Sequence, residues 1–118
     1  MRNIESTPEF LEFYNNQKDR VQKRIDYLIQ KITTEPQISR EVVKKLTDTD
    51  FYELRIHTGE QYRVIMFTID DENFQKAKEV LLLNGFHKKA TKDYKSAIKA
   101  ATNLLNKYTE NIEDDESE

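Results

Sequence analysis

The sequence contains no cysteine and no tryptophan, and only two glycines and two prolines occur among its 118 residues. Without cysteine the chain can form neither a disulfide framework nor a thiolate metal site. The two histidines, His57 and His87, lie 30 positions apart, which does not match the paired ligands of a structural zinc site. Two glycines are too few for a glycine-rich phosphate-binding loop. We therefore expect neither a metal nor a cofactor.

Long apolar runs are missing as well. No apolar segment of the chain reaches the roughly 20 residues that a helix needs to cross a membrane. The N-terminus also lacks the apolar central region of a secretory signal peptide. These two absences predict a cytoplasmic protein without membrane association.

Charge is distributed unevenly along the chain. The 19 basic and 22 acidic residues give a formal net charge of −3. The last nine residues hold six of those acids and no base, so the preceding residues carry 19 bases against 16 acids. A mildly basic body favours contact with nucleic acid, although many ordinary domains have a similar charge. We predict one domain over residues 1–109 and a disordered acidic tail over residues 110–118.

The N-terminal half has the apolar spacing of helices. Residues 2–5 predict a short strand, and Ser6 with Glu9 has the spacing of a capping box. A single helix over residues 8–33 would be about 39 Å long, which is long for so small a domain. Asn15 and Asn16 favour a turn, so we predict a helical hairpin. Residues 39–46 predict one further helical turn. The apolar stripe of the second helix comprises Val21, Ile25, Leu28, Ile29 and Ile32.

The C-terminal half changes to the two-residue period of strands. Residues 51–57, 61–69 and 79–86 predict three strands, with a glycine-containing hairpin loop at residues 58–60. The third strand is apolar without alternation, which predicts burial on both faces of the sheet. A last helix begins near Asp93, and its apolar stripe runs from Tyr94 to Tyr108. The predicted fold class is α+β in the order (β)ααβββα, a small antiparallel sheet with its helices mainly on one face.

Two arginines hold an informative position in the predicted hairpin. With a three-residue loop His57 faces Gln61, and counting back places Arg55 opposite Arg63. Like charges opposite each other on one sheet face destabilise the sheet unless an anion lies between them. Two interpretations remain open: the pair binds an external anion such as a phosphate, or each arginine pairs with a local acid such as Glu53.

Further candidates lie at the ends of strands. Lys88, Lys89 and Lys92 form a basic segment after the third strand, either as part of a binding site or as a solvated linker. His57 and His87 could carry protons near neutral pH or be bystanders. Tyr62 and Tyr94 could stack on a nucleic-acid base, and for Tyr94 a role in the core is the stronger interpretation.

These residues together resemble a known protein family. The segments Tyr52-Glu53-Leu54-Arg55, Tyr62-Arg63 and Gly85-Phe86-His87-Lys88-Lys89 resemble the phage-derived Gp49-like/HigB branch of the RelE/ParE toxin superfamily, with residues 9–108 matched. The resemblance implies a RelE-like fold and the toxin of a type II toxin–antitoxin system. Members of the family typically cleave mRNA, commonly at the ribosome. We therefore predict an endoribonuclease that acts on translated mRNA by a metal-independent mechanism. The resemblance also implies a cognate antitoxin, in HigB systems often a helix-turn-helix protein of the HigA type.

The resemblance assigns roles to some of the candidates. Arg55, Arg63, Lys88 and Lys89 fall on the family's basic positions and are the predicted catalytic residues. The predicted RNA-binding residues are His57, Tyr62, His87 and Lys92. Two alternatives remain: a ParE-like toxin that inhibits DNA gyrase, and a catalytically inactive binding module derived from a toxin.

Overall fold

The computed structural model describes the backbone of residues 1–116 and the side chains of residues 1–110. In chain order the elements are β1 (Asn3–Ser6), α1 (Pro8–Asn15), α2 (Asp19–Thr34), β2 (Val43–Lys45), β3 (Phe51–His57), β4 (Gln61–Thr68), β5 (Glu79–His87) and α3 (Asp93–Glu116). The α+β class and the predicted order of the main elements are confirmed. The predicted helical hairpin corresponds to α1 and α2, which are separated at Asn16–Lys18.

The strands form one sheet in the order β1-β5-β4-β3-β2. The predicted meander is its centre, because β3, β4 and β5 pair antiparallel. The sheet is mixed rather than wholly antiparallel, since β1 runs parallel to β5. The helical turn predicted over residues 39–46 is confirmed only at its start, where the Ser39 carbonyl accepts hydrogen bonds from the Val42 and Val43 N–H groups. Residues 43–45 instead form β2 and pair with β3, with Val43 opposite the buried Leu54. An apolar partner in the ladder therefore overrides the local preference of this segment.

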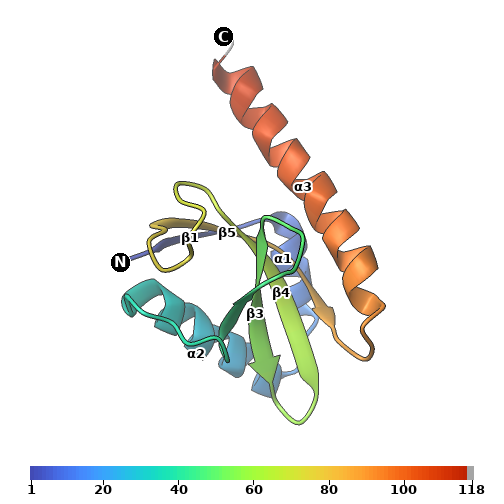
Figure 1. Ribbon diagram of the computed structural model, residues 1–118. Helices are drawn as coiled ribbons and strands as arrows, with labels where there is room; N and C mark the ends of the chain where they lie inside the picture. Colours follow the sequence, from blue (N-terminus) through green and yellow to red (C-terminus); the bar gives the residue numbers. More distant parts are fainter. Residues whose placement is uncertain (117–118) are drawn as a thin grey trace.

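Helices cover both faces of the sheet, which corrects the expectation that they lie mainly on one. The helices α1 and α2 pack on one face, and α3 crosses the other (Figure 1). Consecutive residues of a strand point to opposite faces of the sheet. In the central strands both members of such a pair are apolar, so both faces need a cover. Val64 and Ile65 are each fully buried, the first against α1 and α2 and the second against α3. Burial of β5 on both faces, predicted from its continuous apolar run, is confirmed by Leu82 and Leu83.

The start of α1 lies one residue from its predicted cap. Thr7, not Ser6, is the capping residue, and its hydroxyl accepts a hydrogen bond of 3.0 Å from the Phe10 backbone N–H. Pro8 occupies the first turn as predicted, where its missing N–H costs nothing. This cap also ties the helix to the sheet, because the Thr7 hydroxyl donates to the backbone carbonyl of Leu83 in β5.

The last helix is longer than the sequence pattern predicts. We expected it to end before Glu110, whereas α3 continues through Glu116 and projects beyond the edge of the sheet (Figure 1). The predicted end of the helix is therefore wrong, since residues 110–116 continue it, whereas the domain boundary at residue 109 stays a prediction. The remainder of the predicted acidic tail, residues 117–118, lies outside the described residues.

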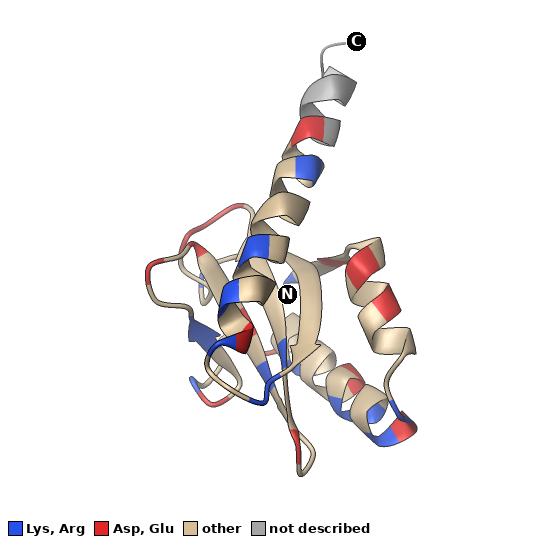
Figure 2. Ribbon diagram, turned by 90° about the vertical axis from the view of Figure 1, so that its right-hand side faces the viewer, with Lys and Arg blue, Asp and Glu red and all other residues tan. Residues whose placement is uncertain are grey.

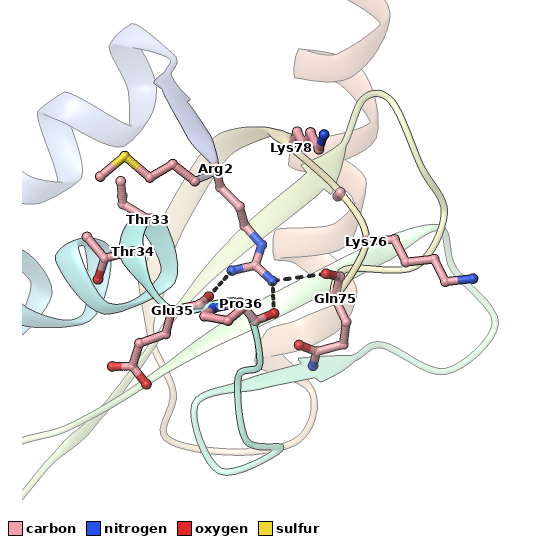
Figure 3. Close-up of a pocket in the computed structure, with 10 residues that line it drawn as sticks. Arg2, Thr33, Thr34, Glu35, Pro36, Gln75, Lys76 and Lys78 are labelled. Atoms are coloured by element: carbon pink, nitrogen blue, oxygen red, sulfur yellow. Dashed lines mark hydrogen bonds between the residues drawn. The ribbon is translucent and has the colours of Figure 1, made fainter.

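Arg2 fastens the end of α2 to the loop before β5. Its guanidinium donates to five backbone carbonyls and lies 4.7 Å from the ring centroid of Phe74. Figure 3 shows the hydrogen bonds to Glu35, Pro36 and Gln75. The carbonyls belong to Ile32, Glu35, Pro36, Phe74 and Gln75. Burial lowers the pKa of Arg2, and the side chain stays charged because an arginine pKa is so high. A cation also stabilises the negative end of the α2 dipole.

We expect Arg2→Ala to lower the free energy of unfolding by about 2–4 kcal/mol, because five backbone carbonyls lose a charged donor. Arg2→Lys should give an intermediate loss, since an ammonium cannot reproduce the planar fork. Urea denaturation measures both values, and the exposed Lys78→Ala serves as the charge-matched control. A loss no larger than that of Lys78→Ala would contradict this role of Arg2.

Candidate functional site

The predicted register of the hairpin is confirmed. His57 pairs with Gln61, and Arg55 lies directly opposite Arg63. Gly59 in the loop has a φ of +87°, a conformation that favours glycine. The two arginines therefore share the sheet face that α3 covers.

The anion between the two arginines is an internal carboxylate. Glu53 Oε1 lies 3.3 Å from Arg55 Nε and 3.4 Å from Arg63 Nε. Glu53 is 3% exposed, and its second oxygen has no hydrogen-bond partner among the described residues. Of the two interpretations left open by the sequence, the structure shows the pairing with Glu53. This carboxylate offsets the repulsion that two facing arginines would otherwise cause.

Arg63 is held entirely inside the protein. Its side chain is 0% exposed and donates to the Tyr94 hydroxyl at 3.1 Å, the Tyr62 carbonyl at 2.9 Å and Gln61 Oε1 at 2.7 Å. Every nitrogen of the guanidinium thus has a partner. Arg63 can orient Glu53 and Tyr94, but it has no surface with which to contact a ligand directly.

Tyr94, the second residue of α3, is the contact of this helix with Arg63, from which its hydroxyl accepts a hydrogen bond. Burial, followed by hydrogen bonding with Glu53 and the charge of Glu53, raises the pKa of Tyr94. The phenol therefore stays protonated at neutral pH. The role in the core predicted for Tyr94 is incomplete, because its ring also lines the neighbouring pocket.

A pocket of about 400 Å³ opens between β2, β3 and the start of α3; we call it the β3–α3 pocket. Arg55 reaches it with a side chain that is 28% exposed, and Lys88 Nζ lies 5.8 Å from the ring centroid of Tyr94. Lys44 pairs with Glu53 in the ladder and adds a third cation. The lining residues are Lys44, Lys45, Leu46, Thr47, Glu53, Arg55, Lys88, Thr91, Tyr94 and Ile98. Their cations outnumber the single acid, so the pocket suits an anion.

Several predicted site residues lie elsewhere. Tyr62 is only 8% exposed and stacks on His87 with the ring centroids 4.6 Å apart, on the sheet face of α1 and α2. Glu60 accepts a hydrogen bond from the Tyr62 hydroxyl at 3.1 Å and lies 3.7 Å from His87 Nε2. This pair is thus turned away from the β3–α3 pocket, and buried Tyr62 has no free face for a base.

The two outer lysines of the basic segment also stand apart. Lys92 lines a different pocket together with His87 and Ser96. Lys89 is exposed and lines neither pocket, and its backbone N–H donates to the Asp93 carboxylate at 2.8 Å. Of the four residues predicted to be catalytic, the structure thus brings Arg55 and Lys88 to the β3–α3 pocket, places Arg63 behind it and leaves Lys89 outside.

His57 lies at the end of β3, two residues beyond Arg55. Partial burial, followed by the positive charges of Arg63, Arg55, Arg24 and Lys88, lowers the pKa of His57. The imidazole is therefore neutral at pH 7 and can accept a proton. Arg55 and Lys88 line the β3–α3 pocket and Arg24 lies on α2, so positive charges from both regions act on His57.

Lys44 was missed by the sequence analysis, and Glu53 was considered only as a partner for the arginines. The error follows from the helical turn predicted over residues 39–46. The buried residues Val43 and Leu46 lie three positions apart, which is helical spacing rather than the two-residue period of a strand, so this segment gave no local signal for β2. Among the described residues no group of three or more histidine, aspartate or glutamate side chains could hold a metal ion. None of the described helices is long and apolar enough to cross a membrane.

Solved structures share this fold. A chain of the intact E. coli RelBE toxin–antitoxin complex matches with a TM-score of 0.58 at 14% identity, covering 76% of this chain and all of that chain. A double mutant of the E. coli toxin RelE in the free state matches with a TM-score of 0.57 at 15% identity, covering 83% and 95%. The isolated E. coli RelE toxin matches with a TM-score of 0.56 at 14% identity, covering 84% and 97%. The architecture is thus of the RelE class.

A family comparison is more specific than the shared fold. The model of the phage-derived Gp49-like proteins matches residues 12–106, which is most of the chain. The chain belongs to this family, as the resemblance in its sequence predicted. No curated protein matches it.

Proposed function

We propose that this chain is the toxin of a type II toxin–antitoxin system and cleaves translated mRNA at the ribosome. The observation that supports this function is the β3–α3 pocket, an open, cationic space that Arg55, ion-paired with buried Glu53, lines together with Lys88. Membership of the Gp49-like family and the fold of the RelE toxin support the same conclusion. RNA supplies the anion that such a pocket would bind, because every linkage carries a phosphate.

The proposed reaction uses the RNA's own 2′-hydroxyl as nucleophile. The 2′-oxygen attacks the adjacent phosphorus, the bond from phosphorus to the 5′-oxygen breaks, and a 2′,3′-cyclic phosphate and a 5′-hydroxyl result. His57 takes the proton of the 2′-hydroxyl, and Lys88 gives a proton to the departing 5′-oxygen. Arg55 stabilises the charge that develops on the phosphoryl oxygens. Arg63, which has no exposed surface, keeps Glu53 and hence Arg55 in place. No metal ion is required by these steps.

The proton transfer predicts a pH profile. The lowered pKa of His57 lies below the usual value of about 6.5, and only the neutral imidazole is a base. We expect kcat/KM for RNA cleavage to be flat above about pH 6.5 and to fall below the lowered pKa, as the imidazole gains a proton. The His57→Gln variant should be slower and should lack this acidic limb. An acidic limb that persists in His57→Gln would assign the titration to another group.

An antitoxin is the proposed protein partner. The RelBE structure pairs a toxin with its antitoxin, and the resemblance in the sequence implies a helix-turn-helix protein of the HigA type. Co-expression of the neighbouring gene should restore growth if it encodes that partner.

Induced expression in a bacterial host tests the proposed function. We expect growth arrest together with new 5′ ends inside translated transcripts, and neither effect with Arg55→Ala at equal soluble protein. Growth arrest with intact transcripts and damaged DNA would instead support a gyrase inhibitor. No arrest from folded, soluble protein would support a binding module without catalysis.

A further inference from the structure

A second basic groove lies on the opposite side of the β3–β4 hairpin from the β3–α3 pocket. It has a volume of about 580 Å³ and lies between the first turns of α2 and the hairpin tip at residues 57–59. Its α2 wall carries Arg20, Lys23, Arg24 and Tyr27, and no acidic residue is among the described residues that line it. We call it the α2 groove. In Figure 2 the basic positions of α2 and of the loop before α3 lie on either side of this hairpin.

The cations of the α2 groove are available to a ligand. Arg20 Nη2 lies beside the hairpin turn, 4.0 Å from the position that a Cβ on Gly59 would take. Among the described residues neither Arg20 nor Arg24 forms an ion pair, and Lys23 pairs only with Asp19, at 3.4 Å. Both members of that pair are largely exposed, so the pair contributes little to stability and is easily exchanged.

The α2 groove also has an aromatic side chain that the core does not need. Tyr27 is 52% exposed and is one of the few large hydrophobic residues on the surface of the described chain. The guanidinium of Arg24 lies 5.1 Å from the centroid of its ring. An exposed aromatic ring beside a planar cation can stack on an unpaired nucleic-acid base, whereas a solvated charged surface has no use for such a ring.

The α2 groove and the β3–α3 pocket are joined through His57. The histidine lines the α2 groove and follows Arg55 by two residues on β3. Desolvation and the positive charges of Arg63, Arg55, Arg24 and Lys88, which come from both regions, lower its pKa. The β2 ladder ends at Leu54, and one further hydrogen bond of 2.8 Å joins the Arg55 backbone N–H to the Val42 carbonyl. Among the described residues the outer edge of β3 has no paired strand beyond Arg55. A chain bound at Arg55 can therefore pass this edge toward α2.

We propose that the α2 groove binds single-stranded RNA next to the phosphate held in the β3–α3 pocket. Arg20, Lys23 and Arg24 contact the phosphates of the flanking nucleotides, and Tyr27 stacks on one of their bases. Single-stranded RNA is the occupant because stacking on Tyr27 requires a base that is free of a duplex partner. This inference rests on the proposed function, since it extends the RNA from the reacting phosphate outward.

Binding of a labelled oligoribonucleotide of about 12 nucleotides, methylated at every 2′-oxygen, tests this surface on the full-length chain. Methylation blocks the nucleophile, so the active protein can be used without cleavage. We expect the triple variant Arg20→Gln, Lys23→Gln, Arg24→Gln to reduce the slope of log K against log salt by about 2, from roughly 0.7 per phosphate contact. Tyr27→Ala should weaken binding by about tenfold with little change of that slope.

The control is the triple variant Lys95→Gln, Lys99→Gln, Lys107→Gln, which removes the same charge from exposed positions on α3. It should bind within about twofold of the parent. If the α2 variants bind as the control does while Arg55→Ala binds weakly, the inference is overturned and the proposed function stands. If the parent itself binds no free RNA, the inference is overturned, and cleavage of mRNA in a translation reaction decides the proposed function separately. RNA binding equal to the parent's, with lost neutralisation by the antitoxin, would reassign the α2 groove to the protein partner.

Discussion

Replacing Arg63 with methionine is expected to lower the free energy of unfolding by about 3–5 kcal/mol, the range for breaking a buried ion pair from one side. Arg63 is fully buried, and its removal leaves the interior carboxylate of Glu53 with Arg55 as its remaining ion-pair partner among the described residues. The Tyr94 hydroxyl and the Tyr62 carbonyl also lose a donor. Urea denaturation of the purified protein measures the loss.

Arg55→Met is the matched control for this prediction. It removes a cation from the same carboxylate, but the Arg55 side chain is 28% exposed and Glu53 keeps its contact with Arg63. We expect a loss of about 1 kcal/mol or less. In addition, Glu53→Gln combined with Arg63→Met should destabilise less than the sum of the single variants, because no unpaired charge remains. Equal losses for Arg55→Met and Arg63→Met would contradict the different roles that we assign to the two arginines.

Replacing Arg55 with alanine is expected to slow RNA cleavage by about 10²–10³-fold, the usual cost of losing one preorganised group that stabilises developing charge. The fold should remain intact, so the thermal midpoint should stay close to that of the parent. Cleavage rates of a synthetic mRNA in a translation reaction give the comparison. Lys92→Ala is a suitable control, since it removes a predicted RNA-binding cation that lies outside the β3–α3 pocket. Similar losses for both variants would mean that the pocket has no special place in the reaction.

The register of the hairpin could be predicted because it depends on local features. A three-residue loop around Gly59 determines which residues face each other, and strict alternation then places Arg55 and Arg63 on one face. Burial of β5 was likewise visible in its unbroken apolar run. Both features need only sequence neighbours and the geometry of a strand.

The features that were missed depend on contacts between distant segments. Strand β2 has only three residues, and it forms because Val43 pairs with Leu54 of β3 in the ladder. The placement of α3 on the second face of the sheet follows from its packing on Ile65 and Leu83. The apolar run of β5 predicts that both faces are covered, but it does not show which helix covers which face. The same limitation affected the site: Tyr62 and His87 sit at the correct strand ends but point away from Arg55.

Burial decided which candidates can contact a ligand, and burial is a property of the whole fold. Arg55 and Arg63 are equivalent in the sequence pattern, yet only the side chain of Arg55 reaches the surface. Glu53 turns the predicted repulsion between them into an internal network. The proposed site therefore has one exposed arginine that is oriented from behind, rather than two arginines that hold a phosphate between them.

The most direct test of the central claim is to add the purified protein to a translation reaction and map the 5′ ends of the mRNA. A second template with an inactivated start codon reports whether translation is needed. We predict cuts within the translated region only, with 5′-hydroxyl and 2′,3′-cyclic phosphate ends, and their loss with Arg55→Ala. Intact mRNA in the presence of folded parent protein, or cuts that Arg55→Ala makes equally well, would contradict the assignment of the β3–α3 pocket as an RNA-cleaving site.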